Sequence, residues 1–174
     1  ALMHHYLRAA GQKVIEPAEA LRRSPARFAQ YVPQALAIYE NYARSRRDSD
    51  SRQWKVLDVE REYEVTLGGR LYTQRVDLTV SEGQSVVFYD HKTTAGKIDK
   101  VPAEWKMSGQ FSGYQAIGKH LAESLFGLPF SGVGVNLVQT VPPYETRSHR
   151  FEVAPAVEAA FVQSAKQTDA DIER

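Results

Sequence analysis

The chain has 174 residues, of which 43% are apolar and 25% charged, and these proportions exclude a disordered or fibrous protein. It has no cysteine, which excludes disulfides, cysteine-bound zinc, iron–sulfur clusters and thiol nucleophiles. The formal net charge is +1, so any nucleic-acid partner would have to be held by a local basic surface.

No apolar run approaches the roughly 18 residues that a transmembrane helix needs. The first residues, ALMHHYLRAAG, lack the pattern of a signal peptide, so we expect a cytoplasmic protein without membrane contact. They begin abruptly inside a helical pattern, and we therefore expect the natural protein to begin earlier or the domain to belong to a larger parent protein. No linker divides the chain, which predicts a single domain over 1–174.

The N-terminal part of the chain is predicted to be helical. Residues 2–10 form a short helix candidate that ends at Gly11. Residues 27–47 carry aromatic and aliphatic side chains at helical spacing, and Pro33 either kinks this helix or marks its true start. A basic, polar stretch over 43–55 is expected to end it.

Three strands are predicted next. Residues 56–67 and 70–80 alternate in strand fashion on either side of Gly68-Gly69, a hairpin signal. A second turn at 81–85 leads to 86–92, which is apolar on both faces and should therefore lie centrally in the sheet.

The C-terminal part returns to helices and strands. Residues 93–103 are predicted to form a loop and 104–126 a helix. Strands are expected at 132–139 and 147–153, and a closing helix at 155–173. This order favours an α/β fold, with a mixed sheet and helices on both of its faces.

The second hairpin predicts that two acidic residues face each other. If residues 82–85 form its loop, Ser81 pairs with Val86, and Asp77 then stands opposite Asp90. In this register their Cβ atoms would lie roughly 5 Å apart. A register shifted by one residue would place a neighbour of Asp90 opposite Asp77 instead.

Two carboxylates this close repel each other unless one is protonated or a cation lies between them. Oxygen ligands suit Mg²⁺ or Mn²⁺, and Lys92 lies on the same strand face as Asp90. Two acids, a metal and a lysine suit the hydrolysis of a phosphodiester. The alternative is an exposed Asp–Lys pair worth under about 1 kcal/mol, but charges at the end of a buried strand favour a site.

The motifs around these residues resemble the RecB-type exonuclease branch of the PD-(D/E)XK nuclease superfamily. They occur in the family's order: Glu60, then Gln-Arg-Val-Asp (74–77), Val-Val-Phe-Tyr-Asp-His-Lys-Thr-Thr (86–94) and Gln-Phe-Ser-Gly-Tyr (110–114). The resemblance spans about residues 2–150 and implies a restriction-endonuclease-like mixed sheet flanked by helices. The chain departs from the pattern at Gln74, where the family usually has glycine.

The resemblance implies a metal site and its ligands. Asp77 and Asp90 would bind Mg²⁺ or Mn²⁺, together with the backbone carbonyl of His91 and one histidine of the N-terminal helix. His4 fits better than His5, because it has a leucine three positions later. A tag remnant or a solvated helix face would explain this histidine pair nearly as well. Lys92 would be the catalytic lysine.

The resemblance also implies supporting residues. Gln110 and Tyr114 would brace the site and contact DNA, although an ordinary amphipathic helix would share their spacing. Arg75 matches a basic residue that is common in this strand. Glu60 would support the catalytic residues, or else simply face solvent.

Basic and aromatic residues are candidates for contacts with DNA. Those nearest the predicted site are Lys97, Lys100, Trp105 and Lys106. More distant candidates, each of which is individually better explained as solvated surface, are Arg44, Arg46, Arg47, Arg52, Lys55 and Tyr89.

These features together predict a metal-dependent deoxyribonuclease that acts on DNA ends or single strands in repair, recombination or phage DNA processing. No helicase motif is present, so a helicase or recombination partner would have to be a separate protein or another part of a larger parent. Two alternatives stay open: a catalytically silent DNA-binding or assembly module with the same fold, and a small α/β domain without a nucleic-acid role.

Overall fold

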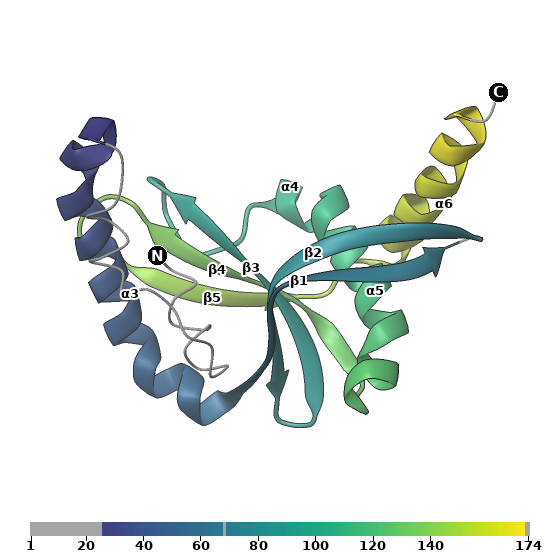
Figure 1. The fold of residues 1–174 in the computed structure, drawn as a ribbon, viewed down its shortest axis with the longest axis horizontal. Coiled ribbons are helices and arrows are strands. Elements are labelled where there is room, and N and C mark those ends of the chain that lie inside the picture. The colour runs from purple at the N-terminus through teal and green to yellow at the C-terminus, as the bar shows by residue number, and fades with distance from the viewer. Residues whose placement is uncertain (1–25, 68, 173–174) are drawn as a thin grey trace.

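The computed structural model describes residues 26–67 and 69–172, so the predicted helix 2–10 and both His4 and His5 lie outside the described residues. The fold is a mixed five-stranded sheet with flanking helices, an α/β arrangement consistent with a restriction-endonuclease-like architecture (Figure 1). In chain order its elements are η1 (Ala26–Tyr31), α3 (Val32–Gln53), β1 (Trp54–Leu67), β2 (Arg70–Glu82), β3 (Ser85–Thr94), α4 (Ala103–Lys106), α5 (Gly109–Phe126), β4 (Phe130–Gln139), β5 (Thr146–Phe151) and α6 (Pro155–Ile172).

The strands lie in the order β1-β2-β3-β4-β5, which confirms the central position predicted for β3. Neighbouring strands are antiparallel except for β3 and β4, which are parallel and are joined through α5. The β1–β2 hairpin is much longer than the other strand pairs and extends as a ribbon beyond the rest of the sheet (Figure 1).

The long N-terminal helix differs from its prediction at both ends. A 3-10 turn precedes it, and α3 begins at Val32, so Pro33 marks its first turn and does not kink it. The helix then continues through the basic stretch to Gln53, whereas the sequence predicted that it would end near residue 47. That stretch contains no glycine or proline, and its arginines have good helix propensity.

The helix predicted over 104–126 is interrupted. A single turn, α4, ends at Lys106, and α5 begins afresh at Gly109. The hydroxyl of Ser108 caps α5 by accepting a hydrogen bond from the backbone N–H of Phe111, which favours a new helix start at this point. The first turn of this new helix contacts β2, where Gln74 donates a hydrogen bond to the Gln110 carbonyl.

Each face of the sheet has its own apolar core. Phe88 and Val135 pack against Phe111 and Tyr114 under α5, whereas Tyr89 packs under α3. Because strand side chains alternate, Asp90 shares the α5 face with Phe88, and His91 shares the α3 face with Tyr89. The apolar pattern of β3 therefore determines the side of the sheet on which Asp90 lies.

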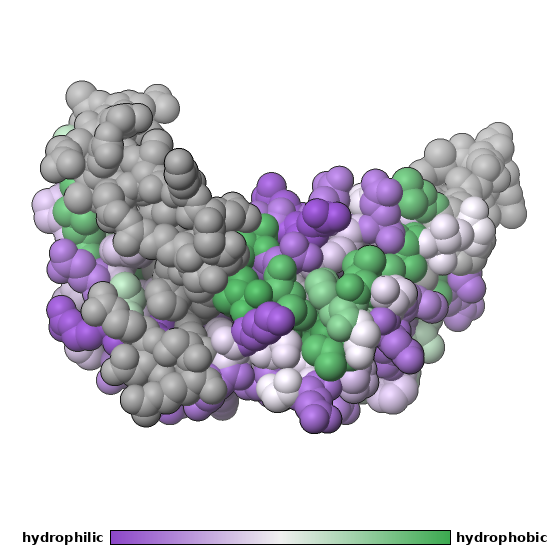
Figure 2. Space-filling model, turned by 60° about the horizontal axis from the view of Figure 1, so that its bottom comes forward, coloured by the Kyte–Doolittle hydropathy of each residue, from purple (hydrophilic) through white to green (hydrophobic). Residues whose placement is uncertain are grey.

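Large apolar side chains also remain on the surface, and Figure 2 shows hydrophobic areas between hydrophilic ones on one face of the molecule. Those that are well exposed are Tyr31, Leu71, Met107, Leu125 and Val141. Within the part of the chain that the structure describes, no helix has the length and hydropathy needed to span a membrane.

Candidate active site

The register predicted for the second hairpin is confirmed. Ser81 pairs with Val86, and the ladder continues to Leu78 opposite Tyr89. The loop is shorter than expected, because Glu82 pairs with Ser85 and only two residues form the turn. A turn this tight requires left-handed backbone, which Gly83 supplies with φ 61°.

Beyond Leu78 the two strands separate. β2 stays paired with β1, and β3 continues along β4, where Asp90 lies beside Val135. Asp77 and Asp90 are thus the first residues past the last rung of the β2–β3 ladder. The carboxylate of Asp77 bridges the opening strands, since its Oδ2 accepts a hydrogen bond of 2.9 Å from the backbone N–H of His91.

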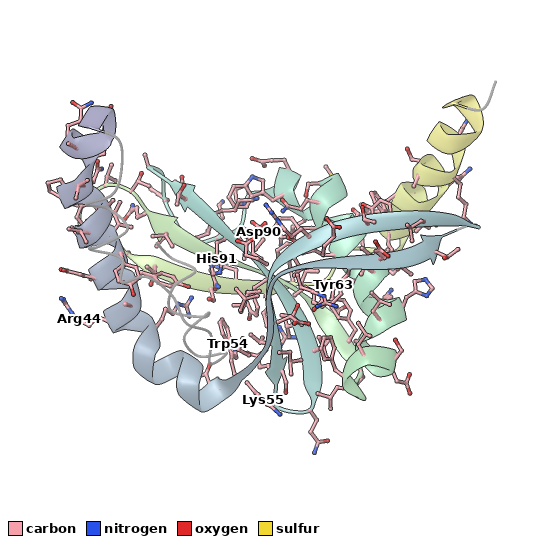
Figure 3. The ribbon with its side chains drawn as sticks, in the orientation of Figure 1. Arg44, Trp54, Lys55, Tyr63, Asp90 and His91 are labelled. Atoms are coloured by element: carbon pink, nitrogen blue, oxygen red, sulfur yellow. The ribbon has the colours of Figure 1, made fainter. Side chains whose placement is uncertain are left out.

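Asp90, which is labelled in Figure 3, is the most buried of the predicted acidic residues that the structure describes, and its exposed fraction is 2%. Burial raises the pKa of its carboxyl group, and the nearby charge of Asp77 raises it further, while Lys92 and Gln110 act in the opposite direction. Its Oδ2 lies 2.8 Å from the Lys92 Nζ as an ion pair. The predicted pairing of Asp77 with Asp90 is not formed, because the β2–β3 ladder ends at Leu78 and Tyr89, and both acidic residues lie just beyond its last rung.

Gln110 connects Asp90 to Lys92. Its amide nitrogen donates to Asp90 Oδ1 at 2.5 Å, and its amide oxygen accepts from Lys92 Nζ at 2.9 Å. The Tyr114 hydroxyl, one helical turn later, lies 3.5 Å from the same Asp90 oxygen and donates to the Arg75 carbonyl at 3.1 Å. Burial, followed by the charges of Asp90 and Asp77, raises the pKa of this hydroxyl, so Tyr114 acts as a neutral donor.

The side chain of His91 lies on the opposite face of the sheet, where its ring is 6.2 Å from that of Tyr42. Its backbone is what reaches the site. The N–H and C=O of one strand residue project to the same side. Because the His91 N–H points to Asp77, its carbonyl also faces the opening between β2 and β3.

The oxygen atoms gathered at this site are suitable ligands for a hard divalent cation. Two carboxylates and a backbone carbonyl are oxygen ligands of the kind that Mg²⁺ and Mn²⁺ prefer. Asp90 Oδ2 is buried and lies 2.8 Å from Lys92 Nζ, so a cation bound here would share this oxygen with the lysine. No group of three or more His, Asp or Glu side chains with metal-binding geometry occurs within 26–67 and 69–172. The imidazole ligand expected from His4 lies outside these ranges.

Glu60 does not join this cluster directly. The β1–β2 register would place it opposite Asp77, but that rung is missing, and Glu60 adopts a left-handed φ of 53°. Its carboxylate forms an exposed ion pair with Arg75, with Oε2 3.3 Å from Nε. Among the described residues, Glu60 is linked to the site through Arg75, whose carbonyl accepts a hydrogen bond from Tyr114.

The left-handed backbone at Glu60 leads to a testable expectation. Replacing Glu60 with valine should lower the free energy of unfolding by about 1–2 kcal/mol, because a β-branched side chain is strained at positive φ. The matched control is Glu62→Val, since Glu62 is also exposed on β1 and has ordinary strand backbone. Urea denaturation measures both; equal losses would contradict the strain at Glu60.

The basic residues around the site are mostly on the surface. Lys97, Lys100 and Lys106 are exposed on or beside the loop that leads to α4. Trp105 is half-buried against the core under α5. Trp105 and the Phe151 ring, over which Lys106 lies, belong to the core under α5, on the face of the sheet that carries Asp90.

Other candidates for DNA contact lie elsewhere. Tyr89 is 1% exposed and packs on Trp54 at 4.6 Å, so it is not available for stacking on bases. Arg46 donates to Asn136 and Ser148 on the α3 face. Figure 3 shows Arg44 and Lys55 away from Asp90, on α3 and at the start of β1. The side chains of Arg47 and Arg52 are not among those that the structure describes.

One residue that contacts the candidate site was not predicted from the sequence. Gln74 appeared there only as a departure from a glycine pattern, yet its amide nitrogen donates to the Gln110 carbonyl at 2.9 Å. The role of Gln74 could have been inferred from Gly113, a buried helical glycine that leaves room for a side chain from β2.

Comparisons with known proteins include two distant structural neighbours. No family model and no curated protein matches the chain. Among solved structures, the crystal structure of SSO0001 is 14% identical with a TM-score of 0.42, covering 97% of this chain and 83% of that one. A protein from Eubacterium rectale named "putative exonuclease" is 9% identical with a TM-score of 0.42, covering 99% of this chain and 79% of that one. Neither likeness is strong enough to assign a function.

Proposed function

We propose that the chain is a Mg²⁺- or Mn²⁺-dependent deoxyribonuclease, a RecB-like exonuclease that acts on DNA ends or single strands. The observation that carries the proposal is the contact set around Asp90. A buried carboxylate meets a lysine and a glutamine beside a second carboxylate, at the point where two strands part. The sequence motifs that resemble the RecB-type nucleases supply these same residues.

Asp77, Asp90 and the His91 carbonyl would hold the cation, and His4 would complete the ligand set. When bound, such a cation lowers the pKa of a water molecule and stabilises negative charge on a phosphate. Hydrolysis joins a water oxygen to phosphorus and expels the sugar oxygen, so negative charge increases on the phosphate oxygens in the transition state.

Lys92 would stabilise that charge. Its ammonium group is held between Asp90 and the Gln110 amide oxygen, so its position is fixed before a substrate arrives. A donor that is already oriented stabilises developing charge without reorganising during the reaction. Gln110 would therefore serve to orient both Asp90 and Lys92.

DNA would approach over the loop that precedes α5. Lys97, Lys100 and Lys106 supply positive charge for the phosphate backbone, and Trp105 borders the same loop. The biological setting that we propose is cytoplasmic DNA repair, recombination or phage DNA processing, with a helicase or recombination protein as a partner.

The test uses linear and circular DNA, labelled at the 5′ or 3′ end, with Mn²⁺ or with a chelator. We expect linear DNA to be shortened only in the presence of Mn²⁺, while intact circles survive. Cleavage of circles would indicate an endonuclease instead. Salt-dependent DNA binding without any Mn²⁺-dependent cleavage would contradict the nuclease and favour a silent DNA-binding module.

A further inference from the structure

The side chain of Gln74 connects β2 to the first turn of α5. Its amide nitrogen donates to the Gln110 carbonyl at 2.9 Å, and its amide oxygen accepts from the Tyr72 hydroxyl at 3.3 Å. Both ends of the amide are thus engaged, and the side chain is half-buried between strand and helix.

Gly113 provides the space for this contact. A Cβ atom at this position would lie 2.0 Å from Gln74 Oε1 and 2.8 Å from the Tyr72 hydroxyl. Gly113 lies inside α5 and has ordinary helical backbone, so the glycine is needed for close approach and not for an unusual φ. Gln74 and Gly113 are therefore complementary in shape.

A second bond ties the next turn of α5 to the adjacent residue of β2, since the Tyr114 hydroxyl donates to the Arg75 carbonyl. The two bonds run in opposite directions, one from the strand side chain and one from the helix side chain. Asp77 follows two residues later on the same strand. The spacing between β2 and α5 is hence fixed immediately beside the candidate site.

We infer that Gln74, seated against Gly113, is a positioning residue that holds the first turn of α5 so that the Gln110 amide lies between Asp90 and Lys92. Gln74 itself contacts neither Asp90 nor Lys92 and acts through the Gln110 backbone. Its effect on structure stands on these contacts alone, whereas its effect on catalysis rests on the proposed function.

The structural part can be tested without metal or DNA. In ¹⁵N-labelled protein, the side-chain amide signals of Gln110, assigned with the Gln110→Glu variant, should shift and exchange faster with solvent in Gln74→Met. Methionine has the same length but donates no hydrogen bond. Gln84→Met, in the exposed turn between β2 and β3, is the matched control and should leave the Gln110 signals in place. Unchanged Gln110 signals in folded Gln74→Met would overturn the inference, and Gln74→Ser gives the same readout should the methionine variant not fold.

The effect on catalysis is tested by a double-mutant cycle between Gln74 and Gln110. Gln74→Met should lower the Mn²⁺-dependent kcat about tenfold in the wild-type background and have almost no effect in a Gln110→Ala background. Equal losses in the two backgrounds would contradict an action through Gln110. If the wild-type chain does not cleave DNA, the proposed function fails, but the amide signals still decide whether Gln74 positions Gln110.

Discussion

Asp90→Asn is expected to lower Mn²⁺-dependent DNA cleavage by a factor of roughly 10³ or more, and Lys92→Met by a similar factor. Asparagine keeps the shape of Asp90 but removes the negative charge that would hold the cation. Methionine keeps the length of Lys92 but removes the ammonium group beside Asp90. Initial cleavage rates at saturating Mn²⁺ measure both effects.

The matched controls are Glu123→Gln and Lys166→Met, which remove the same charges at exposed positions outside the proposed site. Both should cleave like the wild type. Because Asp90 is buried and paired with Lys92, urea denaturation of Asp90→Asn is needed alongside the rates, so that lost cleavage is separated from lost folding. A folded Lys92→Met protein that cleaves DNA at the wild-type rate would rule out the assigned role of Lys92.

Phe88→Ala is expected to lower the free energy of unfolding by about 3–5 kcal/mol. Phe88 is fully buried in β3 and contacts the rings of Tyr63, Tyr114 and Phe130, with the Tyr63 ring stacked at 5.4 Å. Truncation leaves a cavity that these rings fill only in part. Urea denaturation gives the loss directly.

Tyr31→Ala is the control for Phe88→Ala. It also removes an aromatic ring, but Tyr31 is 56% exposed. Its cost should stay below about 1 kcal/mol. A similarly small cost for Phe88→Ala would mean that the core under α5 is packed less tightly than the structure indicates.

The hairpin that carries Asp77 and Asp90 could be predicted because local signals determine it. Alternating side chains and turn residues set its register, and a slip of one residue would place Val80 and Val87 on opposite faces of the sheet. The same alternation places Asp90 and Lys92 on one face. These patterns lie within a few residues of one another, so the sequence alone is sufficient.

The separation of β2 from β3 after Leu78 could not be predicted in this way. Nothing in the strand sequences marks the end of the ladder, because the separation depends on β4 and β1 as competing partners. The contact of Gln74 with Gly113 likewise joins residues that are distant in sequence and depends on tertiary packing. The interruption before α5 had a local signal in Ser108, but the helical pattern on both sides obscured it.

The most direct test is calorimetric titration of the wild-type chain with Mn²⁺, alongside Asp77→Asn, Asp90→Asn and the double variant. One shared cation predicts that the wild type binds Mn²⁺, that each single variant loses most of the affinity, and that the double variant loses little more than either single one. Binding by Asp90→Asn with wild-type affinity, or no binding heat from the wild type, would contradict a cation held jointly by Asp77 and Asp90.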